Sequence, residues 1–141
     1  MAEADVLVDS SIWIEGLRPR ASARIQTLLK ALIESNRIVV TDMVRLEVLS
    51  GARSVKEFGE FRADFEAVRC LVTTSKEWRR AEELGLVLGR RGLSVPPADT
   101  LIAAVAIEHD VPLWHADRDF ERIKHVETGF RTFWSPQQVP A

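Results

Sequence analysis

The sequence predicts an α/β fold with a largely parallel sheet, and three observations support this. Short apolar runs rich in β-branched residues alternate along the chain with longer segments of helical periodicity. The short runs are strand-sized and apolar throughout, which is typical of buried strands. Finally, 141 residues with 46% apolar and 28% charged side chains predict one globular domain over residues 1–141, and no linker or repeat divides it.

Four strands are predicted from the short apolar runs. The first covers residues 6–8, is rich in valine, and ends in Asp9 followed by two serines. The others cover residues 37–40, 70–73 and 111–115, and the pattern is compatible with a last strand near residues 125–127.

Helices are predicted between the strands, where apolar residues recur every three to four positions. They cover residues 11–15, 22–35, 42–50, 55–68, 76–90 and 97–109, followed by a short helix through residue 123. Asn36 and Gly51 follow two of them, as expected of residues that end helices. Thr41 with Asp42, and Ser75, are the expected N-caps of the helices that follow them.

Cysteine content and the N-terminal residues indicate the compartment. The single cysteine, Cys70, excludes an intramolecular disulfide framework and favours a reducing environment, and its apolar surroundings in the sequence predict a buried side chain. Residues 1–5 are acidic and lack a signal-peptide layout, and no apolar stretch approaches the roughly 20 residues of a membrane helix. We therefore expect a cytoplasmic protein without a membrane partner.

Four carboxylates stand where predicted strands end or the following helices begin. They are Asp9 and Asp117 directly after strands, Glu47 on the helix after the second strand, and Asp99 at the start of an apolar, alanine-rich helix. The carboxyl ends of parallel strands share one edge of the sheet, where ligands bind. Taken singly, Asp9 has an alternative role as a helix N-cap, and Glu47 as a solvent-facing residue. Their joint placement predicts that the four converge.

Converging carboxylates cannot all stay ionised without positive charge between them. Hard divalent cations with oxygen ligands, Mg²⁺ or Mn²⁺, meet that need. Such a cation suits phosphodiester hydrolysis, because it activates water and neutralises charge on the phosphate. The net charge of −2 and the pI of about 5.9 lack the basic excess of many nucleic-acid binders, but acids gathered at a metal site would leave the remaining surface more basic.

Four segments together resemble the ordered motifs of PIN-domain ribonucleases, and most of all the VapC toxins of bacterial and archaeal toxin–antitoxin pairs. They are LVDSSIWI (residues 7–14), RLEVLSG (45–51), PADTLIAA (97–104) and HADRDF (115–120). The resemblance extends over residues 5–133. It implies a three-layer α/β/α fold with a mainly parallel central sheet of four to five strands.

The same resemblance implies a metal-dependent endoribonuclease with Asp9, Glu47, Asp99 and Asp117 around Mg²⁺ or Mn²⁺. Asp9 and Asp99 would be the most direct ligands, Ser10 or Ser11 would support the site, and Asp119 could share the role of Asp117. The family also implies an RNA substrate, a homodimer, and a cognate VapB-like antitoxin that inserts a segment near the acidic pocket. His115 stands where comparable proteins often have threonine.

Two other functions remain open at this stage. A receiver-like signalling module also places acids and Mg²⁺ at strand ends, but it needs a paired acidic motif after the first strand and a lysine after a late one. Here Asp9 is followed by serines, and Lys124 is poorly placed. A non-catalytic domain of the same fold, which binds RNA or ribosomes by occupancy, ranks lower because all four acids are present.

Several further side chains are candidates for contacts. His115 either packs in the core or touches substrate near the acids. Of the four tryptophans, most are expected in the core and one at a protein interface. Candidates for contacts with RNA phosphates are Arg18, Arg45, Arg53, Arg90, Arg91 and Arg118.

Overall fold

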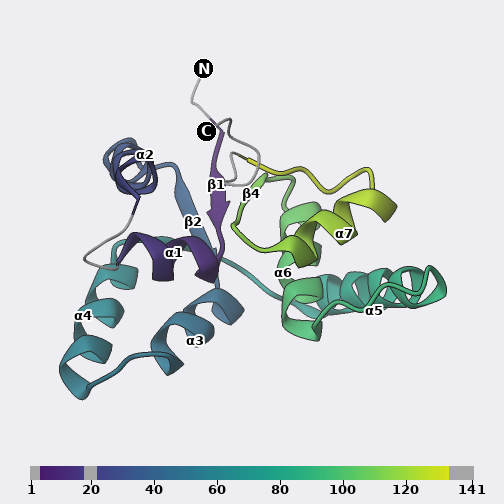
Figure 1. The fold of residues 1–141 in the computed structure, drawn as a ribbon, viewed down its shortest axis with the longest axis horizontal. Helices are drawn as coiled ribbons and strands as arrows, with labels where there is room; N and C mark the ends of the chain where they lie inside the picture. The colour runs from purple at the N-terminus through teal and green to yellow at the C-terminus, as the bar shows by residue number, and fades with distance from the viewer. Residues whose placement is uncertain (1–3, 18–21, 134–141) are drawn as a thin grey trace.

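The computed structural model describes residues 4–17 and 22–133, and its centre is a sheet of four parallel strands (Figure 1). The strands run in the order β3-β2-β1-β4. Their bounds are β1 (Val6–Val8), β2 (Ile38–Thr41), β3 (Arg69–Leu71) and β4 (Leu113–Trp114). The prediction of a parallel α/β sheet is confirmed.

The first strand lies in the middle of the sheet. Leu7 pairs with Val39 of β2 on one side and with Leu113 of β4 on the other, and all three side chains are fully buried. Because the strands are parallel, the chain leaves β1, β2 and β4 at the same edge. The residues after these strands are therefore brought together.

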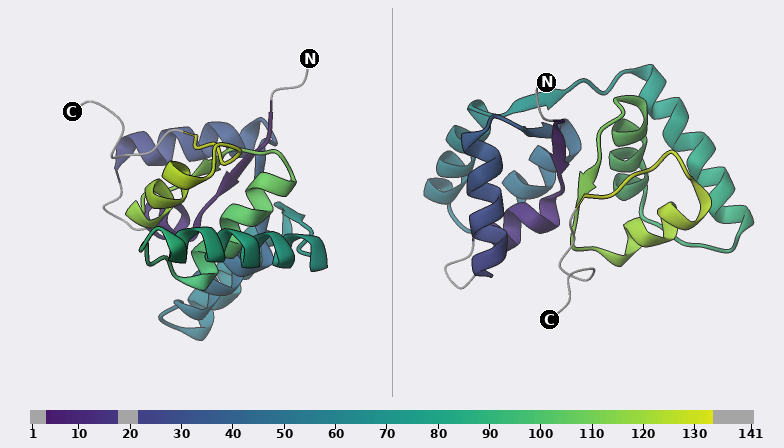
Figure 2. Two further views of the ribbon diagram at one scale, coloured as in Figure 1. Left: turned by 90° about the vertical axis from the view of Figure 1, so that its right-hand side faces the viewer. Right: turned by 90° about the horizontal axis from the view of Figure 1, so that it is seen from above.

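The described residues form seven helices around the sheet. They are α1 (Ser10–Gly16), α2 (Ala23–Glu34), α3 (Asp42–Ser50), α4 (Val55–Glu66), α5 (Ser75–Arg90), α6 (Pro97–Glu108) and α7 (Arg118–Val126). Figures 1 and 2 show α1, α2 and α4 on one side of β1 and α5, α6 and α7 on the other. Right-handed crossovers explain this, because the chain moves outward from β1 to β3 and then returns to β4. The expected three-layer arrangement results.

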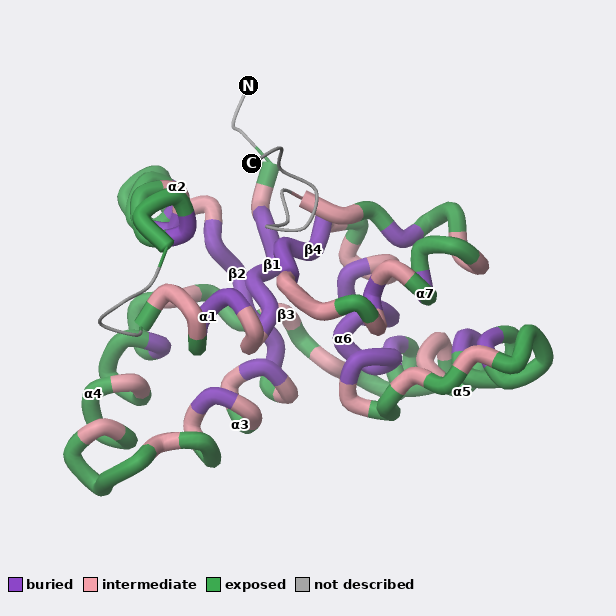
Figure 3. The backbone as a smooth tube through the Cα atoms, viewed as in Figure 1, coloured by how far each residue is buried: buried purple, intermediate pink, exposed green. Residues whose placement is uncertain are grey.

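Burial follows these layers (Figure 3). Strands β1, β2 and β4 are buried along their whole length, and α6 is buried from Asp99 to Ala106. This agrees with the apolar, alanine-rich sequence of α6, because small side chains on every face let the sheet and neighbouring helices approach closely. Asp99 is thus the first residue of a buried run.

Most predicted helix ends are confirmed, and one is shifted. Thr41 caps α3 by accepting a 3.1 Å hydrogen bond from the Val44 amide. The prediction of Ser75 as the next N-cap is wrong, because Thr74 has that role and α5 begins at Ser75. The Glu77 carboxylate reaches back to the Thr74 amide at 2.9 Å, and this reciprocal capping box selects Thr74.

Two predictions near strands are wrong. There is no strand at residues 125–127, because the amphipathic helix α7 continues to Val126, with Phe120 and Ile123 buried on its inner face. Leu113 instead forms an isolated parallel bridge with Thr132. Cys70 is exposed rather than buried, because β3 is the edge strand and its first two residues face solvent.

The tryptophans divide between the core and the surface. Trp13 and Trp114 are buried, whereas Trp78 on α5 is 50% exposed. Trp134 and the candidate Arg18 lie outside the described residues. None of the helices in the described ranges has the length and apolarity needed to cross a membrane.

Candidate functional site

Asp9 follows the central strand, and its side chain is only 2% exposed. One carboxylate oxygen, Oδ2, accepts hydrogen bonds from the Ser11 amide at 3.1 Å and the Ser11 hydroxyl at 2.5 Å. Asp9 is therefore the N-cap of α1, as the alternative interpretation held. Its other oxygen, Oδ1, is buried and has no hydrogen-bond partner in the part of the chain that the structure describes. Helix capping accounts for the contacts of Oδ2, and Oδ1 stays available to a ligand.

Burial raises the pKa of Asp9 to about 6, and the negative charge of Glu47 contributes to the rise. The bonds from Ser11 act in the opposite direction but do not cancel the cost of burial. A carboxylate that is removed from water without a cation favours its neutral form.

Glu47 projects from α3 and is half-buried, not solvent-facing. Its Oε1 accepts a 3.1 Å hydrogen bond from the Ser10 hydroxyl. Burial raises the pKa of Glu47, and the charge of Asp117 raises it further. The charge of Glu47 is thus coupled to that of Asp117, which lies 70 positions later in the chain.

Asp99 is the third residue of α6 and is 8% exposed. Burial is the largest cause that raises the pKa of Asp99 to about 8, followed by the charges of the four neighbouring carboxylates at positions 9, 117, 47 and 119. The positive end of the α6 dipole favours a carboxylate here but does not offset these effects. All four of these carboxylates therefore lie near enough to Asp99 to act on it electrostatically.

Asp117 and Asp119 lie on either side of the start of α7. Asp117 is the N-cap, and its Oδ1 accepts a 3.0 Å bond from the Asp119 amide. Asp99, Asp117 and Asp119 each offer a carboxylate oxygen within 4.8 Å of the others. The structure therefore brings Asp119 to the site together with Asp117. We call Asp9, Glu47, Asp99, Asp117 and Asp119 the acidic edge.

Ser10 and Ser11 serve different acids. Ser10 donates to Glu47, whereas Ser11 donates to Asp9 and accepts a 3.0 Å hydrogen bond from the Ala116 amide. Ser11 thereby ties the end of β1 to the segment between β4 and α7. Both serines hold carboxylates in position, and Ser11 also joins two parts of the site.

His115 is fully buried, which favours the packing role over a contact with substrate. Its Nδ1 accepts a 3.2 Å hydrogen bond from the Asp117 amide, and its Nε2 lies 3.3 Å from Oε1 of Glu121. Burial lowers the pKa of His115, although the nearby carboxylates act to raise it. The ring lies against Phe120, with centroids 5.0 Å apart.

Positive charge is scarce at the acidic edge. In the ranges 4–17 and 22–133, no lysine or arginine forms an ion pair with the four predicted carboxylates. Arg45, although close in sequence to Glu47, places its guanidinium over the Phe65 ring at 5.8 Å.

One basic residue at the site was missed by sequence reasoning. Arg122 Nη1 lies 2.8 Å from Asp119 Oδ1. The i,i+3 spacing of these two residues is a readable signal for such a pair on a helix.

These features fit a hard divalent cation. The acidic edge provides an unpartnered buried oxygen on Asp9 and three further carboxylates grouped closely enough to share an ion. Oxygen donors of this kind are the ligands that Mg²⁺ and Mn²⁺ prefer. The residues present therefore suit the predicted metal.

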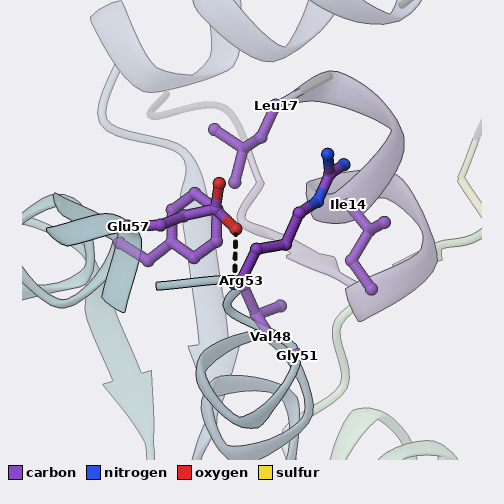
Figure 4. Close-up of a pocket in the computed structure, with 7 residues that line it drawn as sticks. Ile14, Leu17, Val48, Gly51, Arg53 and Glu57 are labelled. Carbon is purple, nitrogen blue, oxygen red and sulfur yellow. Dashed lines mark hydrogen bonds between the residues drawn. The ribbon is translucent and has the colours of Figure 1, made fainter. Parts of the chain in front are cut away.

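A separate cavity of about 290 Å³ lies between α1, α3 and α4 (Figure 4). Figure 4 shows Arg53, in the loop between α3 and α4, extending toward Ile14 of α1 and Leu17 just after it, while its backbone amide donates to Glu57 at 3.0 Å. The cavity contains none of the acidic edge residues. It is therefore a feature distinct from the candidate metal site.

Comparisons with known proteins agree with this geometry. Residues 6–126 match the family model of the PIN domain. The chain is 30% identical to Ribonuclease VapC18 of Mycobacterium tuberculosis, over 90% of this chain and 92% of the relative. It is 34% identical to Ribonuclease VapC21 of the same species, over 83% and 84% of the two chains.

A solved structure shares the fold. The DNA-bound VapBC complex of Salmonella typhimurium contains a chain that superposes with a TM-score of 0.78 at 18% identity, covering 93% of this chain and 98% of that one. At this level of identity the likeness concerns the fold.

Proposed function

Because this chain belongs to the PIN domain family, we propose that it is a metal-dependent endoribonuclease that acts as the toxin of a VapBC-type toxin–antitoxin pair. The observation that carries the proposal is the grouping of five carboxylates of which only Asp119 pairs with a lysine or arginine within the described residues. The similarity to two ribonucleases over most of both chains supports RNA as the substrate.

The acidic edge would hold Mg²⁺ or Mn²⁺. Asp99 and Asp117, with Asp119 or the free Oδ1 of Asp9, are the proposed ligands, and Ser11 would fix the orientation of Asp9. A bound divalent cation supplies Lewis acidity, which lowers the pKa of water and neutralises charge on a phosphodiester. This assignment keeps Asp119 as the residue that could share the role of Asp117, as the sequence allowed.

Glu47 is proposed as the proton-accepting residue. The Ser10 hydroxyl restrains one of its oxygens, and its raised pKa makes it a better proton acceptor than an exposed glutamate. Glu47 lies on α3 and is not one of the closely grouped Asp99, Asp117 and Asp119.

The receiver-like alternative is not supported. Receiver domains have the strand order 2-1-3-4-5, whereas this sheet has β3-β2-β1-β4. Lys124, the nearest candidate for the required lysine, donates to the Thr132 hydroxyl at 3.0 Å. A non-catalytic domain that blocks RNA or ribosomes by occupancy remains the alternative, and the experiment below separates it from the enzyme.

The proposed partners are a VapB-like antitoxin and a second copy of this chain. The antitoxin is supported by the family and by the solved VapBC complex. For the homodimer, the half-exposed Trp78 lies between two hollows of about 230 and 250 Å³ that also share Leu101, and exposed tryptophan is enriched at interfaces. Trp78→Glu should yield monomers in light scattering, and an unchanged mass would remove this support. The cytoplasmic location stays a prediction.

The decisive experiment is cleavage of RNA by the purified protein with Mn²⁺, Mg²⁺ or EDTA. We expect cleavage with either metal, none with EDTA, and none by Asp99→Asn. Expression of the wild type should arrest growth and Asp99→Asn should not. Growth arrest by both forms without RNA cleavage would favour the occupancy mechanism and overturn the catalytic one.

A further inference from the structure

His115 is buried next to Asp117 of the acidic edge, and each ring nitrogen lies close to one polar group. Its side chain is 1% exposed, Nδ1 accepts the Asp117 amide at 3.2 Å, and Nε2 lies 3.3 Å from Glu121 Oε1. The ring therefore bonds to the Asp117 backbone through Nδ1 and packs against Phe120 in the first turn of α7.

The direction of this hydrogen bond fixes the proton on the ring. A backbone amide can only donate, so Nδ1 must be without a proton, and the neutral ring carries its proton on Nε2. Nε2 lies 3.3 Å from a carboxylate oxygen of Glu121 but makes no hydrogen bond within the described residues. The hydrogen bond from the Asp117 amide alone thus selects the tautomer.

The contact resembles a turn motif. Asparagine and serine or threonine side chains accept the amide two residues later in Asx and ST turns. His115 Nδ1 makes the same i to i+2 contact with Asp117. Nδ1 of the imidazole therefore accepts the bond that a side-chain oxygen accepts in those turns, and the ring also packs against Phe120 in the core.

We propose that His115 is a positioning residue, which holds the Asp117 backbone so that the Asp117 carboxylate faces the metal site. This inference rests on the proposed function, because it assigns Asp117 to that site. Outer residues that orient metal ligands commonly change metal affinity or activity by about 10 to 100-fold when they are replaced.

Three substitutions separate positioning from packing. His115→Leu fills a similar volume but removes the acceptor, whereas His115→Asn and His115→Thr leave a cavity but retain an acceptor for the Asp117 amide. Positioning predicts that the leucine variant is the impaired one. Packing alone predicts that the asparagine and threonine variants are worse.

The readouts are the Mn²⁺ dissociation constant by calorimetry and the kcat and KM of RNA cleavage. His115→Leu should weaken Mn²⁺ binding roughly tenfold and lower kcat, with KM little changed. The asparagine variant should stay within about threefold of the wild type. His125→Leu, the same change at an exposed position of α7, should have no effect. Wild-type Mn²⁺ affinity in His115→Leu, or an equal loss in all three His115 variants, would overturn the inference.

A metal-free readout distinguishes failure of this inference from failure of the proposed function. Amide exchange at Asp117, followed by NMR, should be faster in His115→Leu than in wild type or His115→Asn. Imidazole ¹⁵N shifts of the wild type should show the proton on Nε2. Absence of Mn²⁺ binding and cleavage in the wild type would defeat the proposed function. Unchanged exchange, or a proton on Nδ1, would defeat the role of His115.

Discussion

The two ends of α6 differ in the charges that surround their acidic residues. At its C-terminus Glu108 faces Lys76 at 3.4 Å and Arg80 at 4.0 Å, both from α5. At its N-terminus Asp99 faces other carboxylates, and burial with their charges raises its pKa to about 8. The same helix thus carries a carboxylate paired with basic residues at one end and a carboxylate surrounded by other acids at the other end.

The neighbours of each end extend the contrast. Beside Glu108, Arg80 also pairs with Glu127 at 3.1 Å, and the pKa of Glu77 is lowered by its bonds to Thr74 and by His109. At the acidic edge, Arg122 pairs with Asp119 alone among the described carboxylates there. Glu108 and Glu127 thus pair with lysine or arginine of the chain, whereas four of the five carboxylates of the acidic edge have no such pair within the described residues.

The largest expected effect follows replacement of Asp99 by asparagine. We expect RNA cleavage to fall by at least about 100-fold, because a proposed ligand is lost. The metal-free variant should nevertheless be more stable than wild type at pH 8, because it removes a buried, repelled charge. Activity assays with thermal unfolding in EDTA measure both. A variant that is inactive and also destabilised would indicate a structural role for Asp99.

The pH dependence of stability is the second test. Asp9 and Asp99 have folded-state pKa values raised to about 6 and about 8, so above pH 4 the folded protein binds more protons than the unfolded chain. The contribution of Asp9 and Asp99 to the free energy of unfolding is therefore most favourable at acidic pH and decreases as the pH rises toward about 8. The metal-free Tm should drop by several degrees, about 5 °C or more, between pH 5 and pH 8.

Two controls sharpen the pH experiment. Saturating Mn²⁺ should reverse most of the drop at pH 8, because it binds the ionised folded protein. Asp99→Asn should show a shallower pH dependence without metal. A wild-type Tm that rises steadily from pH 5 to pH 8 in EDTA would contradict the raised pKa values.

A smaller effect is expected at Ser11. Ser11→Ala leaves the Ala116 amide without its acceptor and removes the hydroxyl bond to Asp9, while the backbone-amide bond to Asp9 remains. We therefore expect a loss of about 1–3 kcal/mol in unfolding free energy. Cleavage should fall roughly tenfold. Ser35→Ala, which removes an exposed hydroxyl bonded to helix carbonyls, is the matched control. Equal effects of the two substitutions would remove the special role of Ser11.

The smallest effect is expected at the paired end of α6. Glu108→Gln weakens contacts with Lys76 and Arg80 and should cost at most about 1 kcal/mol of stability, because these pairs are partly exposed. Cleavage and Mn²⁺ binding should be unchanged. Chemical denaturation beside the RNA assay tests this, and a loss of Mn²⁺ binding would break the contrast between the two ends.

The central part of the fold could be predicted because its signals are local. The valine-rich run of β1 and the apolar sequence of α6 identify buried elements, and parallel strands place Asp9 and Asp117 at one edge. The prediction of a buried Cys70 was wrong because the apolar sequence of β3 indicates burial. The sequence does not show that β3 is an edge strand whose first two residues are exposed.

Finer features of the site depend on distant contacts. Ser11 and Ala116 are 105 positions apart, and nothing in either segment shows that they bond. Asp117 and Asp119 share one turn, so spacing alone could not rank them, whereas the structure groups both with Asp99. The proposed role of His115 depends on a ring that bonds to the Asp117 amide and packs against Phe120, which its position in the sequence does not reveal.

The most direct test of the account is a calorimetric Mn²⁺ titration of wild type and Asp99→Asn at pH 7, in buffers of different ionisation enthalpy. The raised pKa of Asp99 predicts that wild-type binding releases protons, because ligands must be deprotonated. We expect Asp99→Asn to bind more weakly by about tenfold or more and to release fewer protons. Absence of Mn²⁺ binding by the wild type, or equal affinity and proton release in both proteins, would contradict a metal site at the acidic edge.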